Sequence, residues 1–193
     1  MLSSAEIARG TRGALRFLRF DQAAPLHFDN TMSACLRSFL VMIVAAPLYA
    51  AAMLLRYSEV AYTADDLEVF LIEALHYVVD WLLFPVIFYE IARLRGWLDR
   101  YPRYISALNW MNLPALAISV VVLAIAHVMP EEIADLLRLG LLALTVYWLI
   151  VATRITLGVS WPISALLMLT NVVPSELLSL IVSRILHVTP IGS

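Results

Sequence analysis

Long apolar runs, separated by short polar connections, fill the chain from about residue 32 to its end. Each run has the roughly 20 residues that an α-helix needs to cross the hydrocarbon core of a bilayer. The pattern therefore predicts an all-α integral membrane bundle, with residues 32–193 as a transmembrane domain of five helices. The expected spans are 34–55, 67–90, 105–128, 133–153 and 161–187.

The fifth apolar run is interrupted at its middle by a polar stretch from Asn171 to Glu176 that contains Pro174. A proline removes one backbone hydrogen bond, and a helix inside a bilayer tolerates this loss as a kink. Two arrangements fit the pattern: one kinked crossing, or two half-helices that enter the membrane and return. We favour the kinked crossing, which places the C-terminus outside.

The first segment, residues 1–31, is the most polar part of the chain. On a helix, four arginines fall within an arc of about 80°: Arg9, Arg12, Arg16 and Arg19. The opposite side carries Ile7, Ala14, Leu15 and Leu18. This pattern predicts an amphipathic helix on an anionic membrane surface, although Gly10 and Gly13 weaken it as an isolated helix. A flexible basic tail is the alternative.

The arginines of the connecting segments alternate along the chain. They gather in the N-terminal segment, in the connection between the second and third spans, and, as Arg154, after the fourth span. The two remaining connections carry more acidic than basic residues. Because basic residues stay in the cytoplasm, the pattern predicts a multi-pass protein of the inner (plasma) membrane with a cytoplasmic N-terminus.

The composition supports a membrane protein and excludes several other classes. Hydrophobic residues make up 62% of the chain, against roughly 45–50% in soluble domains. The net charge of −2 gives no reason to expect a nucleic-acid partner. The sequence has no phosphate-binding glycine loop, nucleophile elbow or zinc-protease motif, so we expect neither an enzyme nor a bound cofactor.

The second span contains three ionisable side chains, Glu73, His76 and Asp80, with Tyr77 beside them. Their spacing places them on one face of a helix, directed into the bundle or a wet cavity. A charge inside a bilayer is costly, and those that persist usually have a partner or a function. Because histidine gains and loses a proton near neutral pH, one hypothesis is a site that handles protons or cations.

The other hypothesis is structural, with these groups paired to polar side chains on neighbouring helices. The available partners are Arg37, Asn109, Asn112, His127, Arg154, Asn171 and Glu176. A metal site at Glu73, His76 and Asp80 is a weak alternative, because a Glu-x-x-His metal bundle needs a second copy of the motif. The sequence contains no second copy.

Two stretches resemble a known family. Phe28 and Asp29, followed by the run from Leu36 to Phe39 and by Pro47, are similar to the entry of the first helix in small bacterial relatives of the Yip-domain membrane proteins. The run from Tyr104 to Trp110 resembles the start of their third helix. The resemblance implies five crossings and a cytoplasmic N-terminus. Eukaryotic members of that family are linked to vesicle traffic and bind small GTPases, but no GTPase-binding motif is matched in this chain.

Two functions remain open from the sequence. The first is a Yip-like membrane scaffold or interaction protein without catalysis, in which the charges in the second span fix helix pairing. The second is a small transporter or channel that handles a proton or cation at Glu73, His76 and Asp80. The oligomeric state is left open, with a homo-oligomer as one alternative, because small chains often pair embedded polar groups across a subunit interface.

Overall fold

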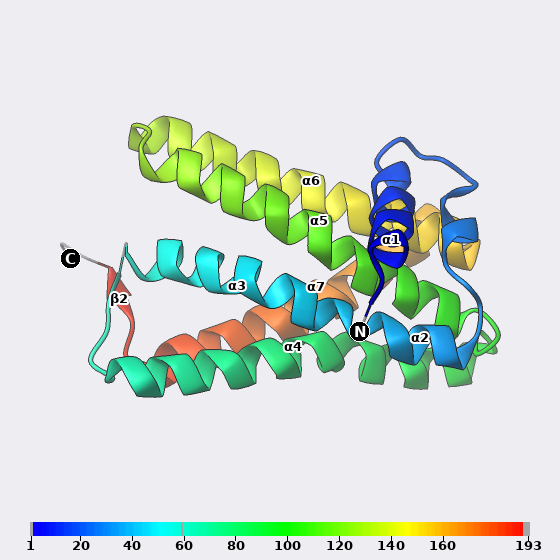
Figure 1. Ribbon diagram of the computed structural model, residues 1–193, viewed down its shortest axis with the longest axis horizontal. Coiled ribbons are helices and arrows are strands. Elements are labelled where there is room, and N and C mark those ends of the chain that lie inside the picture. Colours follow the sequence, from blue (N-terminus) through cyan, green and yellow to red (C-terminus); the bar gives the residue numbers. More distant parts are fainter. Residues whose placement is uncertain (1, 59, 191–193) are drawn as a thin grey trace.

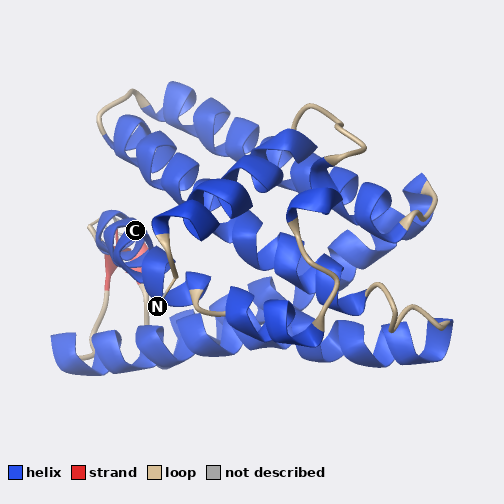
Figure 2. Ribbon diagram, turned by 45° about the vertical axis from the view of Figure 1, so that its right-hand side comes forward, coloured by secondary structure: helices blue, strands red, loops and turns tan. Residues whose placement is uncertain are grey.

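The computed structural model describes residues 2–58 and 60–190, and nearly all of them are helical (Figures 1 and 2). The elements are α1 (Ser4–Phe17), η1 (Ala24–His27), α2 (Met32–Ser38), α3 (Val41–Tyr57), β1 (Val60–Ala61), α4 (Asp66–Arg95), α5 (Tyr101–His127), α6 (Glu131–Leu157), α7 (Trp161–Ile185) and β2 (Thr189–Pro190). The two short strands pair antiparallel with each other.

Five helical stretches in the described residues are long and apolar enough to cross a membrane: Met32–Tyr57, Asp66–Arg95, Tyr101–His127, Glu131–Leu157 and Trp161–Ile185. The prediction of a five-helix membrane bundle with an N-terminal helix is therefore confirmed. The first stretch consists of two helices, α2 and α3, which meet at Phe39 and Leu40. In the fifth, α7 is one continuous helix through Pro174, so the two half-helices are not what the structure contains.

The helix ends follow from local chemistry. The Thr31 side chain accepts a hydrogen bond from the backbone N–H of Ala34 and thereby caps α2. Asp65 caps α4 in the same way by accepting from Leu67 N–H. At the other ends, Gly96 and Gly158 adopt positive φ angles of 69° and 65° and stop α4 and α6. Glycine adopts this left-handed conformation without steric cost, which makes it a common helix terminator.

The bundle is packed unevenly along its length. We call α1, η1 and α2 the collar; they surround the first half of α5 at one end of the molecule (Figure 1). Residues 101–111 of α5 are almost all buried there, whereas residues 115–125 are not. Towards the other end, the α5–α6 hairpin diverges from α3, α4 and α7 (Figure 1). The core therefore lies at the collar end.

The N-terminal helix α1 docks on the bundle through small residues. Gly10 lies so close to the Trp110 ring that a Cβ atom there would overlap with it. The indole Nε1 of Trp148 donates a 2.9 Å hydrogen bond to the carbonyl of Ala14. The buried side of α1 consists of Gly10, Gly13, Ala14 and Phe17. Gly10 thus permits close packing of α1 on α5, and Gly13 permits close packing against His27 and Phe28.

The apolar side expected for α1 coincides only in part with the side that packs on the bundle. Ala14 is buried as expected for the apolar side, but it is buried against protein, and Leu15 is 40% exposed. Gly10 belongs to the packed side although it is not apolar in the pattern, because α1 needs a small residue to approach Trp110. Its contact with an anionic membrane remains a prediction.

Candidate functional site

The polar face of α4 divides into two sites. Glu73 and His76 lie in a closed group of side chains from α3, α4 and α7, whereas Asp80 borders an open pocket between α4, α5, α6 and α7. We call the first the Glu73 cluster (Glu73, His76, Tyr49 and Tyr57) and the second the Asp80 pocket. The sequence expected a single shared site; in the structure Glu73 and Asp80 have different hydrogen-bond partners, because α4 meets different neighbours at successive turns.

In the Glu73 cluster, the carboxyl group of Glu73 has three side-chain hydrogen-bond partners. Tyr49 donates its hydroxyl hydrogen to Oε2 at 2.6 Å, and Tyr57 donates to Oε1 at 2.7 Å. The Nδ1 atom of His76 lies 3.0 Å from Oε2. Glu73 is only 1% exposed and His76 7%. A buried carboxyl group with this many partners stabilises the packing of α3 against α4.

The far side of the His76 ring contacts α7. Its Nε2 atom lies 3.4 Å from the hydroxyl oxygen of Ser179. Tyr77, the fourth residue predicted on this face, points towards α3 instead and donates a 2.7 Å hydrogen bond to the carbonyl of Met42. Its ring packs against Tyr49 with 4.4 Å between centroids. Tyr77 therefore contributes to helix packing rather than to a polar site.

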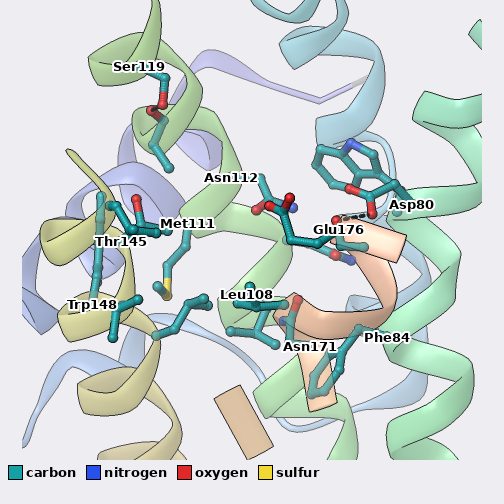
Figure 3. Close-up of a pocket in the computed structure, with 18 of the residues that line it drawn as sticks. Asp80, Phe84, Leu108, Met111, Asn112, Ser119, Thr145, Trp148, Asn171 and Glu176 are labelled. Carbon is teal, nitrogen blue, oxygen red and sulfur yellow. Dashed lines mark hydrogen bonds between the residues drawn. The ribbon is translucent and has the colours of Figure 1, made fainter. Parts of the chain in front are cut away.

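Asp80 has a different environment near the middle of α4. Its carboxylate accepts one hydrogen bond, 2.6 Å long, from the hydroxyl of Ser175 on α7. The side chain borders a cavity of about 460 Å³ that all four helices line. Figure 3 shows Asp80 and Glu176 together with Asn112 around this cavity. Asp80 is partly exposed, so it retains capacity for a further partner.

The Asp80 pocket combines a polar patch with apolar walls. Glu176 supplies a second carboxylate, and Asn112 and Asn171 supply amides. Arg138 also lines the pocket, and its guanidinium forms an ion pair of 3.2 Å with Asp135. The apolar wall includes Trp81, Phe84, Leu108, Met111, Trp148 and Leu149. The arrangement is suited to a molecule with a positive group and an apolar body.

The predicted partners of the α4 face have mixed outcomes. Arg37 is wrong as a partner, because it pairs with Glu6 of α1 at 2.5 Å. Arg154 is wrong too, because its guanidinium stacks 4.6 Å over the Trp161 ring. Asn109 donates to Ser38 at 2.9 Å and also borders the pocket. Of the remaining predicted partners, Asn112, Asn171 and Glu176 line the pocket together with Asp80. His127 is the last residue of α5.

The metal alternative gains no support from the geometry. Across residues 2–58 and 60–190, no three side chains of the types His, Cys, Asp and Glu come together as a metal site requires. Glu73 and His76 are close to each other, but Asp80 bonds to Ser175 in a separate place.

Sequence reasoning missed three residues of these sites: Tyr49, Tyr57 and Ser179. It noted Ser175 only as part of the polar break in the fifth span, not as a partner of Asp80. Tyrosine carries a large apolar ring, so it does not stand out in an apolar run as a polar partner. The serines had a usable signal, because Ser175 and Ser179 are spaced i and i+4, which matches the spacing of His76 and Asp80 on α4.

Comparisons with known proteins do not add to this description. No family model, curated protein or solved structure matches the chain. The resemblance to Yip-domain proteins therefore remains an expectation from short sequence stretches.

Proposed function

We propose that this chain is a small multi-pass membrane transporter that binds an organic cation in the Asp80 pocket. The observation that carries the proposal is the Asp80 carboxylate, near the middle of a membrane-crossing helix. It borders a cavity of about 460 Å³ and, within the described residues, accepts one hydroxyl hydrogen bond. A carboxylate at this depth is costly unless a partner neutralises it. A bound cation would be that partner.

The size and lining of the pocket favour an organic cation over a proton or metal ion. Small-molecule sites usually have volumes of about 300–1,000 Å³ and mostly apolar walls, and this cavity fits both criteria. The rings of Trp81 and Phe84 line it on the same helix as Asp80. Aromatic faces attract organic cations through their negative π surfaces.

The charges around the pocket support a cation rather than an anion. Asp80 and Glu176 contribute two carboxylates, whereas Arg138 is the basic residue among the described lining residues and forms an ion pair with Asp135. The local excess of negative charge attracts a positive ligand and repels a negative one.

Equilibrium binding to the purified protein in neutral detergent tests this proposal. Tetraphenylphosphonium serves as the cation, and tetraphenylborate serves as an anion of the same shape. Binding changes the fluorescence of Trp81 and Trp148, because both line the pocket. We expect saturable binding of the cation and none of the anion. Asp80→Asn should weaken the affinity by about tenfold or more, since it removes a desolvated charge pair.

Glu90→Gln is the matched control for this substitution. Glu90 lies on the same helix, is exposed, and pairs with Arg93 at 2.6 Å outside the pocket. It should bind the cation as the unchanged protein does. Equal affinities of the unchanged protein and Asp80→Asn would contradict the proposed site. Flux of the cation into proteoliposomes tests transport separately, and binding without flux would contradict that part of the proposal.

A second candidate is the non-catalytic, Yip-like scaffold, and the Glu73 cluster favours it. There, polar groups inside the spans satisfy one another and hold α3, α4 and α7 together. A scaffold of this kind needs no ligand in the Asp80 pocket. It predicts that Asp80→Asn changes neither cation binding nor flux, because neither occurs.

A further inference from the structure

The outer side of α1 presents exposed arginine and leucine side chains. Helix α1 crosses α5 and α6 with Gly10, Gly13, Ala14 and Phe17 turned inward (Figure 1). On the opposite side, Arg12 and Leu15 are exposed, and Arg19 follows in the turn after the helix. Because its inward side is packed on Trp110 and Trp148, the helix presents this outer side in a fixed direction.

The four arginines of α1 and its following turn are not equivalent. Arg9 pairs with Asp29 at 3.6 Å, and Arg16 pairs with Asp21 at 2.5 Å. The backbone N–H of Ala23, together with the Arg16 guanidinium, lowers the pKa of Asp21, so this carboxylate stays charged and keeps its pair.

Arg12 and Arg19 have no ion pair within the part of the chain that the structure describes. Both side chains are exposed. The carboxylates nearest in sequence are already paired with other arginines: Glu6 with Arg37, and Asp21 with Arg16. The sequence predicted an anionic surface contact through four arginines, and the geometry reduces it to these two.

Apolar side chains and shallow hollows lie beside these arginines. Leu26 of η1 is 74% exposed and Leu15 is 40% exposed. One hollow of about 520 Å³ is bordered by Arg9, Arg12, Arg16 and Leu26. Another of about 540 Å³ is bordered by Arg12, Arg19, Leu15 and Leu18. Arginine heads beside exposed leucines match the boundary between phosphate groups and acyl chains in a bilayer.

We propose that Arg12 and Arg19 bind the headgroups of anionic phospholipids, and that the collar thereby holds its end of the bundle at a negatively charged membrane surface. The charge is complementary, because Arg12 and Arg19, which form no ion pair among the described residues, meet phosphate groups. Arginine binds phosphate through two parallel hydrogen bonds. The exposed leucines add apolar contact. This site is independent of the Asp80 pocket.

Lipid selectivity of the full chain in phosphatidylcholine vesicles tests the proposal. Spin-labelled phosphatidylglycerol and spin-labelled phosphatidylcholine report, by electron paramagnetic resonance, how strongly each lipid associates with the protein. We expect a preference for phosphatidylglycerol that falls by about threefold or more in Arg12→Gln/Arg19→Gln. Arg12→Lys/Arg19→Lys should keep most of it, because the charges remain.

Arg93→Gln is the control, because Arg93 is also an exposed arginine but lies on α4, outside the collar, and pairs with Glu90. It should leave the lipid preference unchanged. An unchanged preference in Arg12→Gln/Arg19→Gln would overturn the proposal, as would an equal loss in Arg93→Gln. Where the double variant fails to fold, the salt dependence of the unchanged protein decides: a preference that 1 M salt does not reduce contradicts the proposal. Displacement by free glycerol phosphate would identify a soluble ligand instead and overturn the lipid assignment.

Discussion

Glu73 and Asp80 lie two turns apart on one helix and have opposite environments. Glu73 is 1% exposed and accepts hydrogen bonds from two tyrosine hydroxyls beside His76. Asp80 is partly exposed, accepts one serine hydroxyl, and borders a cavity of about 460 Å³. The comparison teaches that a carboxyl group inside a span does not itself indicate a function. Its partners decide whether it holds helices together or remains available to a ligand.

The largest expected effect is on the free energy of unfolding, and it distinguishes Glu73 from Asp80. Glu73→Ala leaves the hydroxyls of Tyr49 and Tyr57 and the ring of His76 buried without their acceptor. We expect the free energy of unfolding to fall by about 3–5 kcal/mol. Unfolding in mixed micelles with increasing dodecyl sulfate measures this. Asp80→Ala is the comparison variant, and an equal loss of stability there would remove the distinction between the sites.

A smaller effect is expected from the tyrosines. Tyr57→Phe removes one hydroxyl that donates to Glu73 at 2.7 Å and leaves the ring in place. The free energy of unfolding should fall by about 1–2 kcal/mol. In a Glu73→Ala background the same change should cost much less, because the acceptor is already missing. Equal costs in both backgrounds would show that Tyr57 and Glu73 are not coupled.

Ser175→Ala tests the environment of Asp80, and the expected loss of unfolding free energy is smaller still. It removes the only hydrogen bond drawn to Asp80 within the described residues and leaves the carboxylate facing the pocket. Hydrogen bonds between membrane helices contribute about 0.6 kcal/mol on average, so the unfolding free energy should fall by that amount. Cation affinity should change far less than in Asp80→Asn. A loss as large as that of Asp80→Asn would assign binding to the hydroxyl.

Glu6 is a carboxylate outside the membrane-crossing spans, to be compared with Glu73 and Asp80. Its substitution has the smallest expected effect, which is on the docking of α1. The Arg37 guanidinium, with help from Ser3, lowers the pKa of Glu6 well below its ordinary value of 4.5. A lowered folded-state pKa means that the pair stabilises α1 docking above pH 4.5, and that this stabilisation is lost as the pH falls from 4.5 towards the lowered pKa. The protection factors of the α1 amides, which correct hydrogen exchange for its intrinsic dependence on pH, should therefore fall on acidification. Glu6→Gln should abolish this part of the pH dependence, and an unchanged pH profile in that variant would contradict the assignment.

The membrane-crossing helices were predictable from the sequence, because span length and apolar character are local properties. The five predicted spans agree with the observed helices to within a few residues at most ends. The division of the first span into α2 and α3 was not predictable from hydrophobicity, since no proline or glycine marks Phe39 and Leu40. The continuity of α7 through Pro174 was favoured but not decided by the pattern.

The site was predictable only in part. The sequence identified Glu73, His76 and Asp80, together with Asn112, Asn171 and Glu176 of the pocket, because each is polar within an apolar run. It missed Tyr49 and Tyr57, because their large apolar rings make them fit an apolar run although each carries a polar hydroxyl. It also could not foresee that α4 meets α3 at one turn and a cavity two turns later, because that depends on how the α5–α6 hairpin diverges.

Carbodiimide labelling tests the difference between Glu73 and Asp80 most directly. Dicyclohexylcarbodiimide is an apolar reagent that enters membranes and modifies carboxyl groups it can reach, and peptide mass spectrometry identifies the modified residue. The account predicts modification of Asp80, with protection by tetraphenylphosphonium, and no modification of Glu73 in the folded protein. Modification of Glu73, or labelling of Asp80 that the cation leaves unchanged, would contradict the account.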